Sequence, residues 1–146
     1  MTAHPAGTGL AALQSALVRA LVLNGPVPAD LDPERVAAVR HQLLDKRART
    51  LAVNWPELAA GFGPAWREAV GGWAAGRAPG GPTSDGYLLA CDVLAGRLPA
   101  APEPARAAAL DVVAGWRPGH HGLARRRGPA TIHRLVARWR HRPLSG

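Results

Sequence analysis

The chain has 146 residues, enough for one domain with a buried core that needs neither a disulfide nor a metal. Hydrophobic residues make up 47% of it and charged residues 19%, a balance that excludes a disordered chain. The net charge of +8 is confined to one end, because residues 1–115 carry ten basic and ten acidic side chains whereas residues 116–146 carry eight arginines and no acid.

The N-terminal end and the cysteine content bear on the cellular compartment. Residues 1–8 predict a disordered lead-in, and we expect no signal peptide because a basic start, an apolar run and a small-residue cleavage site are missing. The apolar stretch at 16–23 contains Arg19 and is too short to span a bilayer. The single cysteine, Cys91, excludes an internal disulfide and a multi-cysteine metal site, so a cytoplasmic setting is expected.

Leucines at helical spacing predict the first helix of a helical domain that covers residues 9–115. We expect this helix to end at Asn24-Gly25 with a residue in the left-handed conformation. The prolines within 25–33 cannot continue a helix and make that stretch a stiff connector. The apolar stripe of the first helix comprises Leu10, Leu13, Leu17 and Leu21.

The second helix is the most strongly marked element. Asp32 is expected to cap its N-terminus and Pro33 to occupy its first turn. The helix is predicted to run to about Asn54, just before a Trp-Pro pair, and Asp45 is placed to pair with Arg49 one turn later. Its apolar positions are Val36, Val39, Leu43, Leu44, Ala48, Leu51 and Ala52.

Glycine and proline divide the next part of the domain into short helices. Residues 55–63 predict one short helical turn closed by glycine. Pro64 then opens a helix with Trp66 and Trp73, one helical repeat apart, on its buried face. The stretch at 76–82 is rich in glycine and proline and predicts a loop.

Two more helices complete the domain. Thr83 or Ser84 is expected to cap the first, and the prolines within 99–104 separate it from the second. The sequence therefore predicts an all-α fold, a compact bundle of five to six helices with no strand before residue 120. The buried positions expected in these two helices are Tyr87, Leu88, Cys91, Leu94 and Leu98, followed by Ala107, Leu110, Val113 and Ala114.

Residues 116–146 form a basic C-terminal segment that follows the helical domain. Its first part, 117–129, predicts a loop. For the part after it, a basic amphipathic helix is favoured and a strand is the alternative. The residues that share the apolar face of the helix are Ile132, Leu135, Val136 and Trp139.

No catalytic or metal-binding pattern stands out. His120 and His121 are adjacent, so their side chains diverge on a helix or a strand and do not readily chelate one ion. Cys91 lies among leucines and is interpreted as a small buried hydrophobe rather than a nucleophile. We expect a protein that is not an enzyme and that has no cofactor and no metal site.

The basic segment is the part of the chain where a partner is expected to bind. Docking to an acidic protein or peptide surface needs only the arginines and tryptophans present. Nucleic acid is the alternative partner, through counterion release, although no nucleic-acid-binding motif accompanies the arginines. Anionic lipid and plain solvation are further alternatives. The candidate residues for partner contact in this segment are Trp116, Arg125, Arg126, Arg127, Arg134, Arg138, Trp139 and Arg140.

Residues 13–99 carry short motifs in a fixed order. A Gly-x-Val-Pro turn at 25–28 follows the first helix, and a Leu-x-x-Lys-Arg element at 43–47 lies on the second. A Pro-x-Leu turn at 56–58, an aromatic helix, a Gly-Gly loop and another helix come next. In this order the chain resembles a small helical family of high-GC bacteria.

Members of that family are encoded beside, or fused to, multinuclear non-haem iron oxidative enzymes that modify ribosomally made peptides. They are akin to helical partner proteins once labelled DNA-binding domains. The resemblance implies an accessory subunit that binds the iron enzyme in a hetero-oligomer and helps to recognise its precursor peptide, while the iron and its ligands belong to the partner. Lys46, Arg47 and Arg49 are further candidates for partner contact, and a helix-surface pairing with Asp45 is the alternative.

Overall fold

The computed structural model describes residues 6–119, 122–125 and 135. Within them the chain forms six α-helices and one two-stranded sheet, which confirms the prediction of an all-α bundle. The elements in chain order are α1 (Ala6–Val22), α2 (Pro33–Asn54), α3 (Pro56–Phe62), the 3₁₀ turn η1 (Gly63–Ala65), α4 (Trp66–Ala74), α5 (Pro82–Leu94), α6 (Glu103–Gly115), β1 (Trp116–Gly119) and β2 (Gly122–Arg125).

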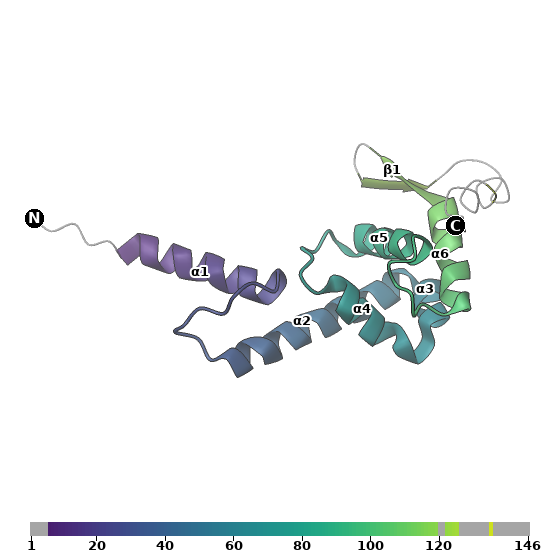
Figure 1. Cartoon of the computed structure of the whole chain (residues 1–146). Coiled ribbons are helices and arrows are strands. Elements are labelled where there is room, and N and C mark those ends of the chain that lie inside the picture. Colours follow the sequence, from purple (N-terminus) through teal and green to yellow (C-terminus); the bar gives the residue numbers. More distant parts are fainter. Residues whose placement is uncertain (1–5, 120–121, 126–134, 136–146) are drawn as a thin grey trace, which may run out of the picture.

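The long helix α2 connects two parts of the molecule (Figure 1). Helices α3 to α6 form the compact part, in which α6 packs on α3 and α5 while α4 and α5 pack on the second half of α2. Helix α1 extends away from this part, and its main contact is with α2. The fold is therefore a small bundle with one projecting helix.

The predicted helix ends of α1 and α2 are confirmed. The Asp32 carboxylate accepts a hydrogen bond from the Glu34 amide at 2.9 Å, and Pro33 is the first residue of α2. After α1, Asn24 has a φ of 55° and the Gly25 amide donates to the Arg19 carbonyl at 3.1 Å. This left-handed turn ends α1 and directs the chain back toward α2.

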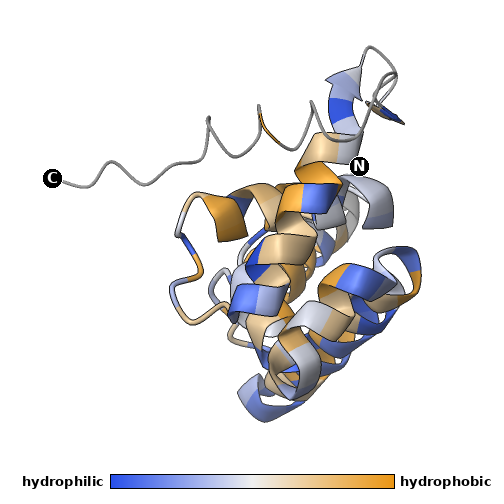
Figure 2. Ribbon diagram, turned by 90° about the vertical axis from the view of Figure 1, so that its right-hand side faces the viewer, coloured by the Kyte–Doolittle hydropathy of each residue, from blue (hydrophilic) through white to orange (hydrophobic). Residues whose placement is uncertain are grey.

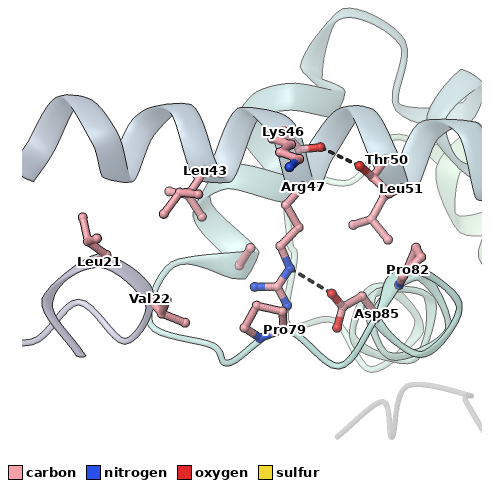
Figure 3. A pocket seen from close by; sticks show the side chains of 13 residues that line it. Leu21, Val22, Leu43, Lys46, Arg47, Thr50, Leu51, Pro79, Pro82 and Asp85 are labelled. Carbon is pink, nitrogen blue, oxygen red and sulfur yellow. Dashed lines mark hydrogen bonds and ion pairs between the residues drawn. The ribbon is translucent and has the colours of Figure 1, made fainter. Parts of the chain in front are cut away.

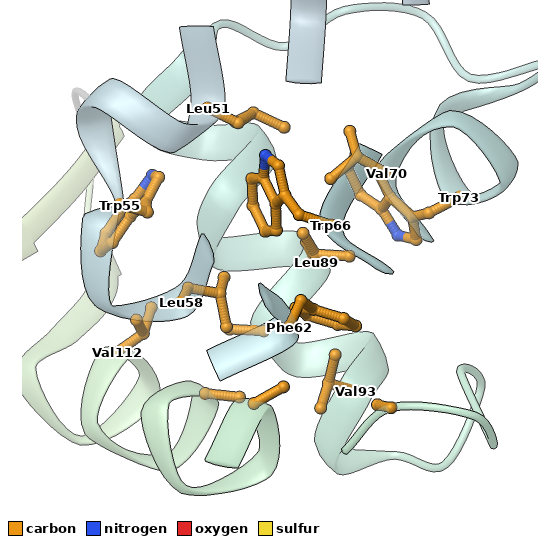
Figure 4. Packing of buried hydrophobic residues seen from close by; sticks show 14 of the residues in the cluster. Leu51, Trp55, Leu58, Phe62, Trp66, Val70, Trp73, Leu89, Val93 and Val112 are labelled. Carbon is orange, nitrogen blue, oxygen red and sulfur yellow. The ribbon is translucent and has the colours of Figure 1, made fainter. Parts of the chain in front are cut away.

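A cluster rich in aromatic residues forms the core of the compact part (Figure 4). Seen from the side of α6, the outer turns of the helices carry both hydrophilic and hydrophobic residues (Figure 2). Burial of such apolar side chains contributes roughly 1.5–3 kcal/mol each, so this cluster dominates the stability of the fold. Its larger members are Leu51, Trp55, Leu58, Phe62, Trp66, Val70, Trp73, Leu89, Val93 and Val112.

The three most buried tryptophans each satisfy their indole N–H. Trp55 donates to the Pro82 carbonyl at 3.0 Å, Trp66 donates to the Ala48 carbonyl at 2.9 Å, and Trp73 donates to a carboxylate of α5 at 2.9 Å. Each bond joins two elements that are distant in sequence, so the indoles fix the helix packing as well as filling the core. The interpretation of Trp66 and Trp73 as core residues is confirmed.

The buried face of α5 differs from the predicted one. Leu88 is 46% exposed, whereas Asp85 and Asp92 are almost fully buried. Residues seven apart lie on the same helix face, and here that face carries two carboxylates that arginines from outside α5 neutralise. Helix α5 also begins at Pro82 with Gly81 as its cap residue and no side-chain cap, so the prediction of Thr83 or Ser84 as the cap is wrong.

Two predictions for the region after α6 are wrong in part. No strand was expected before residue 120 and a loop was expected over 117–129, but the structure has two short strands there. Strands β1 and β2 pair antiparallel, with Trp116 opposite Arg125. Each strand has only four residues, too few to show a period-two pattern. The hairpin is held by packing instead, because Trp116 meets the Trp55 ring edge-on at 5.5 Å.

The predictions for the two ends of the chain can be compared with the structure only in part. Helix α1 begins at Ala6, inside the predicted lead-in, and residues 1–5 lie outside the described residues. The predicted C-terminal helix and its alternative strand lie outside them too, except for Leu135, which is helical and 66% exposed. No helix in the described ranges is long and apolar enough to cross a bilayer.

Two glycine substitutions test the packing of α5 on α2. A Cβ on Gly86 would overlap the Trp55 indole, so Gly86→Ala is expected to destabilise the protein by about 1–3 kcal/mol. Gly72 in α4 faces open space, and Gly72→Ala should stabilise the fold by up to about 1 kcal/mol. Urea unfolding followed by tryptophan fluorescence measures both, and equal effects would contradict the tight contact.

Candidate functional site

Two buried carboxylates organise one side of the bundle. Asp85 and Asp92 are 3% and 5% exposed and lie two turns apart on α5. A charge taken out of water is costly unless a counter-charge and hydrogen bonds accompany it. The partners of these two carboxylates therefore determine how the neighbouring elements are placed.

Arg47 of α2 is the partner of Asp85. Its Nε lies 2.9 Å from Asp85 Oδ2, and its Nη1 donates to the Arg77 carbonyl at 2.8 Å. The Arg47 side chain is 13% exposed, and Asp85 also accepts a hydrogen bond from the Gly80 amide at 3.0 Å. This set of bonds ties α2, the loop before α5 and α5 together at one point.

Asp92 has three donors. The Trp73 indole donates to Oδ2 at 2.9 Å, Arg77 Nη2 lies 3.0 Å from the same oxygen, and Arg97 Nε donates to Oδ1 at 2.7 Å. Burial by itself raises the pKa of Asp92, but the hydrogen bonds from Trp73 and Arg97 outweigh it and hold the pKa below its usual range. Asp92 is therefore ionised at neutral pH.

Trp73 joins the two carboxylate clusters. The Arg47 guanidinium lies 5.5 Å from the centre of the Trp73 ring and the Arg77 guanidinium lies 5.0 Å from it. Both distances are within the range of cation–π attraction. The result is a continuous chain of contacts from Asp85 to Asp92 that makes one wall of the bundle rigid.

Beside this wall lies a pocket of about 370 Å³, which we call the α1–α2 pocket. The end of α1, the middle of α2 and the start of α5 enclose it, and Arg47 reaches from α2 to Asp85 between the other lining residues (Figure 3). Its volume and its largely apolar lining are typical of ligand pockets. The lining residues are Leu21, Val22, Leu43, Leu44, Lys46, Arg47, Thr50, Leu51, Ala74, Pro79, Gly81, Pro82 and Asp85.

Exposed apolar side chains lie on two of the helices that border the pocket. On α1, Leu10, which belongs to the predicted apolar stripe, is 59% exposed, and Val18 is 58% exposed. On α2, Val39 and Leu43 are 41% and 42% exposed. Two helices that contact each other therefore carry large exposed apolar side chains, and exposed apolar surface is a feature of interaction sites.

Metal ligands and the thiol of Cys91 are the groups whose chemistry can be assessed in the described part of the chain. No group of three or more histidine, cysteine or acidic side chains within these ranges could hold a metal ion. Cys91 is half-buried against the core, and burial raises the pKa of its thiol, which disfavours the nucleophilic thiolate.

The structure separates the three candidate residues of α2. Lys46 is exposed and lines the α1–α2 pocket. Arg47 points into the bundle, so its predicted alternative pairing with Asp45 is wrong. Arg49 does pair with Asp45, at 3.2 Å, and Asp45 also accepts from Arg67, whose hydrogen bond holds the pKa of Asp45 below its usual range.

Two candidates from the basic segment lie in the hairpin. Trp116 is half-buried against the core, and the Arg125 guanidinium lies 5.5 Å from the centre of its ring. The structure therefore gives Trp116 a packing role and places Arg125 on the outer side of it. The candidates outside the described residues are Arg126, Arg127, Arg134, Arg138, Trp139 and Arg140.

Sequence reasoning missed Asp85 and Asp92. The signal was their spacing, since two acids seven apart on an otherwise largely apolar helix lie on one face. Their arginine partners could not be identified from that spacing, because Arg47 is 38 residues from Asp85. The apolar residues of α5 recur on several faces, so periodicity alone did not decide which face is buried.

One family matches this chain. The SCO6045-like, C-terminal domain family covers residues 11–95, which is more than half of the sequence. The chain belongs to this family. The matched region contains Arg47, both buried carboxylates and the whole lining of the α1–α2 pocket, whereas α6 and the hairpin follow it. No curated protein and no solved structure matches the chain.

The buried ion pair gives the first prediction from this site. Arg47→Met removes the partner of a carboxylate that stays buried, so it should destabilise the fold by about 3 kcal/mol. Arg49→Met breaks a pair whose arginine is 69% exposed and should leave stability nearly unchanged. Urea midpoints of the two variants measure the difference, and similar midpoints would refute a structural role for Arg47.

Asp92 gives a prediction of pH dependence. Its pKa is lower in the folded protein than in the unfolded chain, so its ionisation stabilises the fold above the ordinary aspartate pKa of about 3.9. This contribution is lost as the pH falls through the lower, folded value. Asp92→Asn should therefore cost about 2 kcal/mol at neutral pH.

The difference between wild type and Asp92→Asn should then shrink as the pH falls below about 4. Urea unfolding of both proteins over a pH series provides the measurement. A constant difference across the series would show that the charge of Asp92 does not contribute.

Proposed function

We propose that this protein is a non-catalytic accessory protein that binds a peptide-modifying enzyme and helps to recognise the precursor peptide. The observation that carries the proposal is the set of exposed apolar side chains on α1 and α2, the two helices that also contribute to the α1–α2 pocket. Leu10 and Val18 are more than half exposed on a helix that has little other contact with the bundle. Covering such side chains with a partner stabilises the complex by roughly 25 cal/mol per Å² of apolar surface.

The architecture suits docking. Helix α1 projects from the compact part, so a partner can contact it without disturbing the core (Figure 1). The Arg47–Asp85 bond holds the pocket wall in place, so little conformational order has to be gained on binding. The proposed role is to present a preformed surface.

The resemblance described above supports the nature of the partner. It implies a multinuclear non-haem iron oxidative enzyme that holds the metal and carries out the chemistry, with this chain as the second component of a hetero-oligomer. The eight arginines of residues 116–146 would attract an acidic surface of such a partner and increase the rate of association.

Co-purification tests this proposal. Expressed with the multinuclear iron enzyme of its own genome, the chain is expected to elute with the enzyme at physiological salt. The double variant Leu10→Glu, Leu13→Glu places charge on the exposed side of α1 and should weaken the complex at least about ten-fold, because two apolar contacts are lost.

Val53→Glu is the matched control. Val53 is 82% exposed on α2 and does not line the pocket, so this variant should still elute with the enzyme. If the wild-type chain elutes alone, the proposal is wrong. Tight binding of duplex DNA that weakens steeply with salt, without co-elution, would instead indicate the nucleic-acid alternative.

A further inference from the structure

We propose that the α1–α2 pocket receives an aliphatic side chain of a peptide segment whose neighbouring carboxylate pairs with Lys46. This inference rests on the proposed role in peptide recognition and names the class of peptide. It follows from the chemistry of the pocket lining and from the charges beside the pocket that the fold has already neutralised.

The apolar lining determines the first part of the ligand. Five apolar residues line the pocket, and in Figure 3 the Arg47 side chain passes between two groups of them. Leu21 and Leu43 lie on one side of it, Leu51 and Pro82 lie on the other, and Pro79 lies below it. None of these five side chains carries a hydrogen-bonding group. Their natural complement is an aliphatic side chain that is removed from water on binding.

The charges at the pocket determine the second part. Asp85 and Arg47 neutralise each other, and Arg47 has further donors bound to the Arg77 and Ala78 carbonyls, so neither offers a free charge to a ligand. The charge of Lys46 is not neutralised in this way, because Lys46 makes no ion pair with any residue of the described ranges. The pocket therefore presents an apolar floor with one unneutralised ammonium group at its edge.

Charge complementarity also identifies what does not fill the pocket. A second copy of α1 would suit the apolar floor, but α1 contains no acidic residue to meet Lys46. The basic segment of residues 116–146 contains no acid either, and its arginines would be repelled. Neither of these two segments supplies both features, and we assign the site to a segment of another polypeptide in which aliphatic and acidic residues are close together.

Fluorescence anisotropy with two labelled synthetic peptides tests the inference. One peptide alternates leucine with glutamate, and the other has lysine in place of each glutamate. The wild-type chain should bind the glutamate peptide about five-fold more tightly, in keeping with an exposed ion pair. Lys46→Glu should reverse this preference, and Arg35→Glu, an exposed change on the same helix outside the pocket, should leave it unchanged.

A second pair of variants tests the apolar floor. Leu43→Asp should weaken the binding of both peptides, whereas Val53→Asp on the same helix should not. Both residues are exposed, so the variants are expected to fold, and urea midpoints check this. Equal binding of the two peptides, or an unchanged preference in Lys46→Glu, would overturn the inference.

The peptide experiments and the co-purification experiment can fail independently, so the inference and the proposed function are tested separately. A chain that elutes with the iron enzyme but does not distinguish the peptides refutes the Lys46 assignment and leaves the accessory role intact. A chain that distinguishes the peptides but elutes alone refutes the enzyme partner and leaves the pocket assignment intact.

Discussion

The burial of two carboxylates on one face of α5 is the constraint on which the rest of the structure depends. Neither Asp85 nor Asp92 can leave water without a cation, and the cations come from α2 and from the loops on either side of α5. Satisfying both carboxylates fixes α5 against α2 and holds the Trp73 ring between two guanidinium groups. The rigid wall of the α1–α2 pocket is a consequence of this arrangement.

Lys46 and Arg47 are consecutive on α2, but their side chains have different surroundings. Arg47 directs all its described contacts into the bundle, while Lys46 lies exposed at the pocket edge. Neighbours in a helix point about 100° apart, so one can serve the core and the other can face a partner. A substitution at Arg47 is therefore expected to act through stability, whereas in our proposal one at Lys46 acts on the ligand directly. The apolar side chains of α1 extend the surface on which we propose that the partner docks.

Local patterns predicted much of the fold. The Asp32 cap, the left-handed turn at Asn24 and the boundaries of α2 follow from side-chain chemistry within a few residues, and the structure has all three. The candidate site was predicted less well. Lys46 was selected and lines the pocket, but the pocket itself needs residues from four helices and a loop that no spacing brings together. The hairpin at Trp116 was missed because packing against Trp55, rather than strand periodicity, stabilises it.

The sequence by itself determined which segments are helical, where they stop, and that the excess positive charge lies at one end of the chain, because these features depend on near neighbours and on composition. Only the tertiary structure decided which face of α5 is buried, which of the adjacent cations on α2 is used internally, and that the leucines at the start of α1 stay exposed. The physical reason is that burial of a charge or a leucine depends on what the rest of the chain brings against it. The arginine that neutralises Asp85 lies 38 residues away in sequence, at a distance that no helical period encodes.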